Sequence, residues 1–430
     1  MKKIQPVPPS GQVDPDLVEN ALFDPEKMEE ISRLNREYYH WDELKYRVDD
    51  KELENTWVLM KFLRRTNFKQ FNLCGLDLKY TMLSDFQEAL HLIDCNSAGL
   101  TDFENYGQKD VQRYAISSVM EEAIASSQME GAVTTRKEAK QMLRSQREPK
   151  NISEKMILNN YLVMEQLKTT LDKKMTVDLI LKMHKTITSG ILREGSAWEG
   201  RFREDNETVV ADPCNGVVFH VPPSYDKVPS MMQELCDFIN RKEKEFIHPI
   251  IKGIIIHYMV GYIHPFVDGN GRMARSLFYW FVLKNDYQLM EFTAISRIMK
   301  NSQAKYGLAY QYAESDDNDL TYFIRFNLNC IVKAVSDLRK YIAKKGAEQK
   351  QIFDLIKSDT ELSRDESLIL IDYARSQEMF SLREISTRYN VSYQTARNYV
   401  THLCELGYLK ITSRSRKTRL YTVQRKCDSE

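Results

Sequence analysis

The stretch from His264 to Arg275 constrains the fold of this chain more than any other feature of its sequence. It reads His-Pro-Phe-Val-Asp-Gly-Asn-Gly-Arg-Met-Ala-Arg. The apolar run Ile254–Tyr262 precedes it, and the apolar run Ser276–Leu283 follows it. Apolar runs of this kind are typical of buried helices, whereas proline and paired glycines interrupt helices. The sequence therefore predicts two packed helices joined by a loop that leads into a helix N-terminus.

This loop has the composition of a phosphate-binding site. Gly269 and Gly271 let the backbone around Asn270 approach a ligand and turn its N–H groups toward an anion. The first turn of the following helix adds further unpaired donors. Arg272 and Arg275 are three residues apart, so we expect both guanidinium groups on one helix face, within reach of one polyphosphate.

Two other side chains of the loop are candidates for a metal ligand and a general base. The carboxylate of Asp268 is a hard oxygen ligand suited to Mg²⁺ that is shared with phosphates. His264 exchanges a proton near neutral pH, which makes it the candidate general base. Each residue alone is a weak signal, because Gly-Asn-Gly turns and loop histidines are common. Their combination within twelve residues favours a site, and neither a Walker A loop nor a dinucleotide-binding turn matches this pattern.

The loop resembles the signature of the Fic family, His-Pro-Phe-x-(Asp/Glu)-Gly-Asn-Gly-Arg-x-x-Arg, at every position. The resemblance extends over roughly residues 110–335 and includes Gly200–Arg203 and a hairpin at Val217–Pro223 in the place of the family's target-positioning flap. It implies a protein adenylyltransferase that transfers AMP from ATP to a protein hydroxyl. It also implies these site residues: His264 as the base, Asp268 as the Mg²⁺ ligand, the amides of Gly269, Asn270 and Gly271 as the anion hole, and Arg272 and Arg275 on the outer phosphates.

A second motif, Ser126-x-x-x-Glu130-Gly131, ends a helix predicted from Gln108 to Glu130. Serine and glutamate four residues apart before a capping glycine form an ordinary helix end. The motif also resembles the inhibitory motif of class II Fic proteins, (Ser/Thr)-x-x-x-Glu-(Gly/Asn). This resemblance implies an ion pair between Glu130 and Arg275, low basal activity, and activation by Glu130→Gly. In some family members the corresponding glutamate also assists removal of AMP, and the sequence leaves that activity open.

The remaining sequence predicts a mainly α-helical protein in three parts. Its 430 residues contain only 16 Gly and 12 Pro, which argues against a β-sandwich or a disordered chain. We expect an N-terminal helical region over residues 1–107 with about 15 disordered residues, the inhibitory helix and Fic core over 108–345, and a winged helix-turn-helix over 346–430. A lone β-hairpin, at Thr208–Val210 and Val217–Val221, is expected to lie over the site.

The C-terminal part carries the basic charge that the whole chain lacks. The chain has 61 Lys+Arg and 61 Asp+Glu, whereas residues 381–426 have ten basic and two acidic residues, a net of +8. The candidate recognition helix Tyr393–Leu406 and the basic turn Arg414–Lys417 suit DNA. The helix carries side chains able to read base edges, namely Gln394, Thr395, Arg397, Asn398 and His402. The alternative function is therefore a DNA-binding transcriptional regulator with a Fic core that senses nucleotide, although many winged helices bind proteins instead.

The other expectations concern compartment and packing. Seven widely spaced cysteines without a Cys-x-x-Cys pair favour a reduced, cytoplasmic location without a zinc site. No apolar run reaches the ~20 residues of a membrane span, so no membrane partner is expected. His184 and His257 fall on apolar helix faces and are interpreted as packing residues. Tyr306 and Tyr310 are either core residues or walls of the adenine pocket. Homodimerisation and the identity of the target protein stay open.

Overall fold

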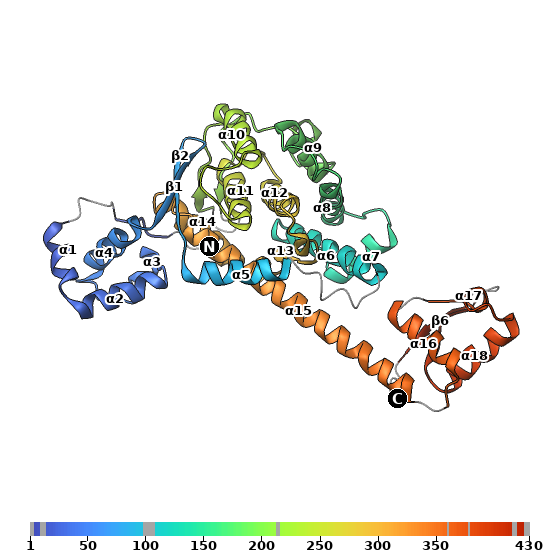
Figure 1. Ribbon diagram of the computed structural model, residues 1–430. Helices are drawn as coiled ribbons and strands as arrows, with labels where there is room; N and C mark the ends of the chain where they lie inside the picture. Colours follow the sequence, from blue (N-terminus) through green and yellow to red (C-terminus); the bar gives the residue numbers. More distant parts are fainter. Residues whose placement is uncertain are drawn as a thin grey trace. The chain divides into compact units, whose positions relative to one another are not determined.

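The computed structural model describes residues 4–8, 14–97, 108–211, 216–358, 361–376, 379–414 and 419–424, and these are mainly α-helical, as predicted. The chain divides into two compact units (Figure 1). The first comprises Met1–Ala98 with Ser118–Val335, and the second comprises Gly99–Ser117 with Ser336–Glu430. The division into three domains, over residues 1–107, 108–345 and 346–430, stays a prediction. No helix among the described residues is both long and apolar enough to cross a bilayer.

Two adjacent helices form the centre of the first unit. Helix α11 (Pro249–Ile263) packs along α12 (Asn270–Lys284), and both are buried on nearly all faces. Such helices are apolar all round because other helices cover them. The covering helices are α8 (Ile152–Lys168), α9 (Val177–Thr188) and α10 (Val228–Asn240). Helix α12 is the helix predicted to follow the loop.

Helix α6 (Gln108–Met129) ends at the position predicted for its glycine cap. Gly131 adopts a φ of 93°, a left-handed conformation that glycine accepts without a Cβ clash, and the amide of Ala132 bonds back to the carbonyl of Ser127. Helix α7 (Arg136–Ser145) follows and begins with a capping box between Thr135 and Glu138. The end of the helix that carries the second motif is therefore fixed by local sequence.

The N-terminal region contains a β-hairpin that the sequence did not predict. Helices α1 (Pro15–Leu22), α2 (Pro25–Arg36), α3 (Trp41–Leu44), α4 (Leu53–Arg65) and α5 (Ser84–Ser97) accompany strands β1 (Phe68–Leu73) and β2 (Leu76–Thr81). The expectation of a lone hairpin was therefore wrong. Cys74 and Gly75 both have positive φ, as a two-residue hairpin turn requires. The prediction failed because tertiary pairing helps to hold polar strand β2: Lys79 exchanges backbone hydrogen bonds with Asn318 and Leu320.

Buried polar contacts attach these N-terminal helices to the chain between α14 (Gln303–Ser315) and α15 (Thr321–Ser358). Lys61 Nζ lies 2.5 Å from Asp316 Oδ1, and Tyr38 donates to Asp319 Oδ2 at 2.7 Å. Arg64 donates to the hydroxyl of Tyr322 at 2.8 Å. Because these side chains are buried and paired, the N-terminal region belongs to the same compact unit as the central helices.

The predicted flap is present as strands β3 (Val210–Ala211) and β4 (Val218–His220), which pair antiparallel and are shorter than expected. Residues 212–215 of its turn, with Cys214, lie outside the described residues. The next α-helix along the chain after α12 is α13 (Ile295–Lys300). The five described cysteines are free thiols, namely Cys74, Cys95, Cys236, Cys330 and Cys404.

In the C-terminal part of the second unit, the described residues form helices followed by a pair of strands, and one helix begins at Tyr393, where the candidate recognition helix was predicted. Helices α16 (Arg364–Ser376), α17 (Leu382–Arg388) and α18 (Tyr393–Glu405) precede the antiparallel strands β5 (Leu409–Arg414) and β6 (Arg419–Val423). These elements share a small core that includes Ile369, Leu370, Phe380, Ile385, Val400 and Leu403. Residues 415–418 of the predicted basic turn and the first residues of the predicted disordered tail lie outside the described residues.

Candidate active site

The loop between α11 and α12 has a sharply defined conformation. Residue His264 ends α11 in the left-handed region, with φ 47° and ψ 58°, and Gly269 precedes α12 with φ 85°. The side chain of Asn270 bridges the loop, because it accepts from the amide of Phe266 at 3.0 Å and donates to the carbonyl of Phe266 at 2.7 Å. The backbone between the two helices is thereby fixed without help from a ligand.

Two residues distant in sequence hold this loop from outside. Arg203, which is 2% exposed, donates through Nε to the carbonyl of His264 at 2.9 Å, and its amide donates to the carbonyl of Pro265 at 2.9 Å. His184 Nδ1 accepts from the amide of Gly200, so Nε2 carries the proton and donates to the carbonyl of Asp268 at 2.9 Å. The sequence predicted a packing role for His184 but did not predict that its partner is the loop.

His264 has the geometry of a general base. It lines a cavity, and its Nδ1 lies 3.3 Å from the carbonyl of Gly261, a pure acceptor. Nδ1 therefore carries the proton, and Nε2 keeps a lone pair. Burial lowers the pKa of His264 to about 4, and the backbone hydrogen bond to Gly261 partly opposes this shift. The imidazole is consequently neutral at pH 7 and able to accept a proton.

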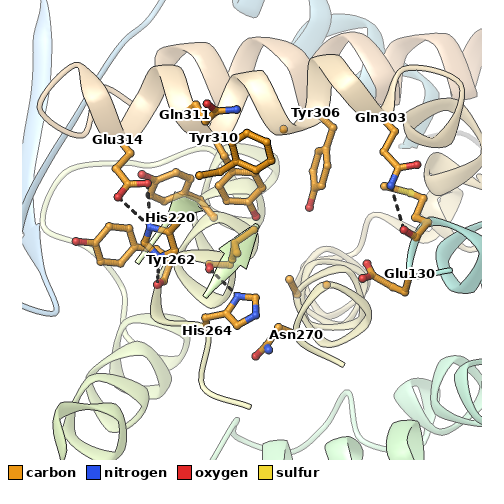
Figure 2. A pocket seen from close by; sticks show the side chains of 18 residues that line it. Glu130, His220, Tyr262, His264, Asn270, Gln303, Tyr306, Tyr310, Gln311 and Glu314 are labelled. Carbon is orange, nitrogen blue, oxygen red and sulfur yellow. Dashed lines mark hydrogen bonds and ion pairs between the residues drawn. The ribbon is translucent and has the colours of Figure 1, made fainter. Parts of the chain in front are cut away.

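The cavity beside His264 measures about 230 Å³ and is lined by the loop, the flap and one face of α14. Figure 2 shows side chains of α14 along one wall, with Glu130 near one end and the pair His220 and Glu314 near the other. Tyr306 and Tyr310, which the sequence placed either in the core or in a pocket wall, are walls of this cavity. His257 is buried, and its Nε2 lies 2.9 Å from the hydroxyl of Tyr306. It is therefore a packing residue whose ring has a hydrogen-bond partner.

The two arginines of the loop are both buried but have different partners. Arg272 lies 3.3 Å from both the carbonyl of Ile187 and Oδ2 of Asp268. Arg275 points to α6, where Nε donates to Ser126 Oγ at 2.8 Å. Within the described part of the chain, Arg272 Nε and Arg275 Nη1 are buried without a hydrogen-bond partner. Buried donors without partners are costly, so these atoms fit a site for an anion.

Glu130 occupies the position in which such an anion would lie. Its Oε1 is 2.7 Å from Arg275 Nη2, the contact predicted from the second motif. A Cβ on Gly271 would lie 2.2 Å from the same oxygen and 3.1 Å from Arg275 Nη1. The absent side chain of Gly271 therefore creates the space for a negative group at the start of α12. That helix has no side-chain cap, which leaves the donors of its first turn for a ligand.

Asp268 fits the role of a shared metal ligand. Its side chain is 47% exposed, Oδ1 accepts from the amide of Gly269 at 2.5 Å, and Oδ2 faces Arg272. Among the residues that the structure describes, no three His, Cys, Asp or Glu side chains cluster as a complete metal site. A Mg²⁺ ion at Asp268 would therefore need phosphate and water oxygens for most of its shell, which is the usual arrangement for this ion.

Residues 174–282, which include this loop, match the sequence model described as the Fic/DOC family. The chain contains a Fic domain. It is similar to the protein adenylyltransferase Fic of Drosophila willistoni, with 28% identity over 232 residues, 53% of this chain and 41% of the relative. It is also similar to the protein of that name from Nematostella vectensis, with 28% identity over 165 residues, 38% of this chain and 34% of the relative. The chain thus spans about two fifths or less of the length of these relatives.

Solved structures share the fold of the Fic domain and its surroundings. A Fic family protein from Desulfovibrio desulfuricans G20 is 21% identical, with a TM-score of 0.54, and the match covers 80% of this chain and 97% of that one. A segment of Fic-1 from C. elegans is 16% identical, with a TM-score of 0.50, and the match covers 77% of this chain and 88% of that one. At these identities the comparison concerns the fold alone.

The flap contacts α14 through two residues, His220 and Glu314, whose pairing the sequence did not predict. His220 Nδ1 lies 2.8 and 2.9 Å from the two carboxylate oxygens of Glu314, and Nε2 lies 2.7 Å from the carbonyl of Tyr262. We call this contact the flap clasp. Both ring nitrogens of His220 therefore face hydrogen-bond acceptors. No signal in the sequence pairs these residues, because 94 positions separate His220 from Glu314.

The candidate base-reading residues outside the Fic domain are placed on α18. Ala396, Val400 and Leu403 face the core of the second unit, whereas Gln394, Arg397 and Asn398 are exposed. Nδ1 of His402 lies 2.8 Å from Oε1 of Glu366, and this hydrogen bond raises the pKa of His402. Thr395 is half-buried and accompanies Ser392 at the helix N-cap.

Proposed function

We propose that this chain is a protein adenylyltransferase that transfers AMP from Mg-ATP to a hydroxyl side chain of a protein. One observation carries the proposal. A neutral histidine, His264, lies on the same cavity as an anion position bounded by Gly271 and Arg275. A base beside a polyphosphate position suits phosphoryl chemistry, in which positioning and charge stabilisation do most of the work. The named relatives support the same reaction class.

The residues divide the reaction between them. His264 Nε2 takes the proton of the target hydroxyl while its oxygen forms a bond to the α-phosphorus, the bond from that phosphorus to the bridging oxygen breaks, and pyrophosphate leaves. Amides of Gly269, Asn270 and Gly271 and the guanidinium groups of Arg272 and Arg275 stabilise the phosphate charge. Bound Mg²⁺, held by Asp268, would neutralise part of the charge on the phosphates.

Glu130 keeps this reaction off in the free protein. Its carboxylate uses the guanidinium of Arg275 and fills the space beside Gly271, where the outer phosphate of a productive ATP would lie. Because two negative groups cannot share that space, ATP binds productively only after Glu130 moves. Glu130 also lies beside the cavity from which AMP would be removed, so deadenylylation belongs to the same proposal as a second activity.

The experiment compares wild type, Glu130→Gly and Glu130→Gly/His264→Ala for incorporation of AMP from α-labelled ATP with Mg²⁺. Both self-labelling and labelling of a cell lysate are scored, and release of AMP from the labelled product is followed separately. We expect labelling in the single variant alone. Absence of labelling in all three proteins, with ATP still bound, would overturn the proposal. An EDTA arm tests the requirement for the metal.

A second candidate function is DNA binding by the C-terminal unit, with the Fic core as a nucleotide sensor. The observation in its favour is the exposed polar face of α18, which carries Gln394, Arg397 and Asn398. These side chains have the chemistry of base-edge readers. A mobility shift that weakens with rising salt and with Arg397→Ala would support this function. If no mobility shift occurs at low salt, DNA binding is excluded, and the C-terminal part of the second unit would be interpreted as a protein-binding module.

A further inference from the structure

A row of polar residues follows one face of α6. Glu122, Ser126 and Glu130 are spaced by four residues, so they lie one above another on the helix surface. The facing helix α12 presents Arg275 and Tyr279, which are also four residues apart. Ser126 and Glu130 both contact Arg275, and Glu122 contacts Tyr279. The inhibitory contact of Glu130 and the contact of Glu122 therefore belong to one helix interface.

Glu122 is the buried end of this row. The residue is 2% exposed, and its Oε2 accepts from the amide of Ser296 at 2.8 Å and from the hydroxyl of Tyr279 at 2.9 Å. Its Oε1 accepts from the hydroxyl of Ser296. The same Tyr279 hydroxyl accepts from the amide of Ile295 at 3.0 Å, and its single proton is shared between Glu122 Oε2 and the carbonyl of Thr293, which is 2.8 Å away. A carboxylate with three donors is held in position and orientation, so it fixes α6 against both α12 and the start of α13.

Exposure increases along the row toward the helix end. The residue Ser126 is 2% exposed, like Glu122, whereas the side chain of Glu130 is 29% exposed. Glu130 also follows the last residue of α6, directly before the left-handed Gly131. The last turn can thus move while the turn that carries Glu122 stays in place.

We propose that Glu122 is a positioning residue for the inhibitory helix: its bonds to Tyr279 and Ser296 set the register of α6 on α12 that brings Glu130 to Arg275. This inference rests on the proposed function and extends it. Glu122 does not touch the cavity and takes no part in the reaction. Its effect on activity passes through Glu130, so it is present only in a chain that still carries Glu130.

The test is a double-mutant cycle in AMP labelling. We expect Glu122→Ala to raise basal labelling about tenfold in the chain with Glu130, because it leaves buried donors without acceptors and loosens the register. In the Glu130→Gly background the same substitution should give no further gain. Glu122→Gln should restore the wild-type value to within about twofold, since the amide oxygen replaces Oε2 and the Ser296 hydroxyl can turn to accept from the amide nitrogen. Equal loss in both backgrounds, or no change in either, overturns the proposal.

A second readout does not depend on activity. Amide hydrogen exchange at residues 128–132 should be about tenfold faster in Glu122→Ala than in wild type and unchanged in Glu122→Gln. If Glu130→Gly also fails to label, the proposed function is wrong, but the exchange rates still decide whether Glu122 positions the helix. Should Glu122→Ala fail to fold, Ser296→Ala, which removes one hydroxyl donor, is expected to give an intermediate rate. An unchanged rate there contradicts the inference.

Discussion

Oε1 of Glu130 lies 2.7 Å from Nη2 of Arg275 and occupies the space that a side chain on residue 271 would fill. In the proposed function, the carboxylate of Glu130 and the outer phosphates of ATP compete for the donors of Arg275 at this position. We therefore predict that ATP affinity and basal activity both depend on this one contact.

Glu130→Gln should raise the affinity for Mg-ATP by about tenfold, because the amide keeps the shape of the side chain but loses the charge-assisted bond to Arg275. Calorimetric titration in the His264→Ala background measures binding without turnover. Glu148→Gln, at an exposed glutamate, is the matched control and should leave the affinity unchanged. Equal affinities for Glu130→Gln and its parent would show that Glu130 does not compete with ATP.

Gly271→Ala should separate folding from nucleotide binding. The added Cβ would lie 2.2 Å from Glu130 Oε1 and 3.1 Å from Arg275 Nη1, so it fills the anion position. Residue 271 is in the first turn of α12, where alanine favours helix more than glycine does, by up to about 1 kcal/mol. The Cβ displaces the end of the partly exposed Glu130 side chain and weakens its ion pair with Arg275, which offsets the gain in helix propensity. We therefore expect the melting temperature to stay nearly level while ATP binding falls at least about tenfold. Unimpaired ATP binding in the Glu130→Gly background would place the phosphates elsewhere.

Glu314→Ala should loosen the flap by removing the acceptor of His220 Nδ1 in the flap clasp. The side chain of Glu314 is 35% exposed, so the contact is expected to contribute about 1 kcal/mol. Hydrogen exchange at residues 218–221 should become several-fold faster. Glu204→Ala removes an exposed partner of Arg201 and serves as the control. Equal exchange rates at residues 218–221 in Glu314→Ala and Glu204→Ala would contradict a role for the flap clasp.

Acid should destabilise the first unit through its buried histidines. Burial lowers the pKa of His40, His184 and His264 to about 4 and that of His257 to about 3. In the unfolded chain these groups bind protons near pH 6.5, so stability is full above that pH and is lost as the pH falls toward 4. From pH 7 to pH 5 each histidine should cost about 2 kcal/mol of the free energy of unfolding.

Urea unfolding at the two pH values measures this loss. His257→Gln should reduce the difference between pH 7 and pH 5 by about 2 kcal/mol, because one buried proton-binding group is removed. If the free energy of unfolding falls as much from pH 7 to pH 5 in His257→Gln as in wild type, His257 does not contribute to the acid sensitivity.

Local sequence specifies the parts of the protein that depend on neighbours within a few turns. The loop from His264 to Arg275, the helices on either side and the cap at Gly131 follow from periodicity and from glycine and proline positions, which act locally. The family signature also predicted the partner of Glu130, although 145 positions separate it from Arg275.

Contacts between residues far apart in the sequence depend on how the helices and strands pack. His184 reaches the loop over 84 positions, and Glu122 reaches Ser296 over 174. Arg272 and Arg275 were expected to share one task, yet packing gives each a different partner. Strand β2 is a strand partly because the chain at Asn318 pairs with it. Periodicity encodes which face of an element is buried, whereas the partner on that face depends on how the elements pack, and that information is spread over the whole chain.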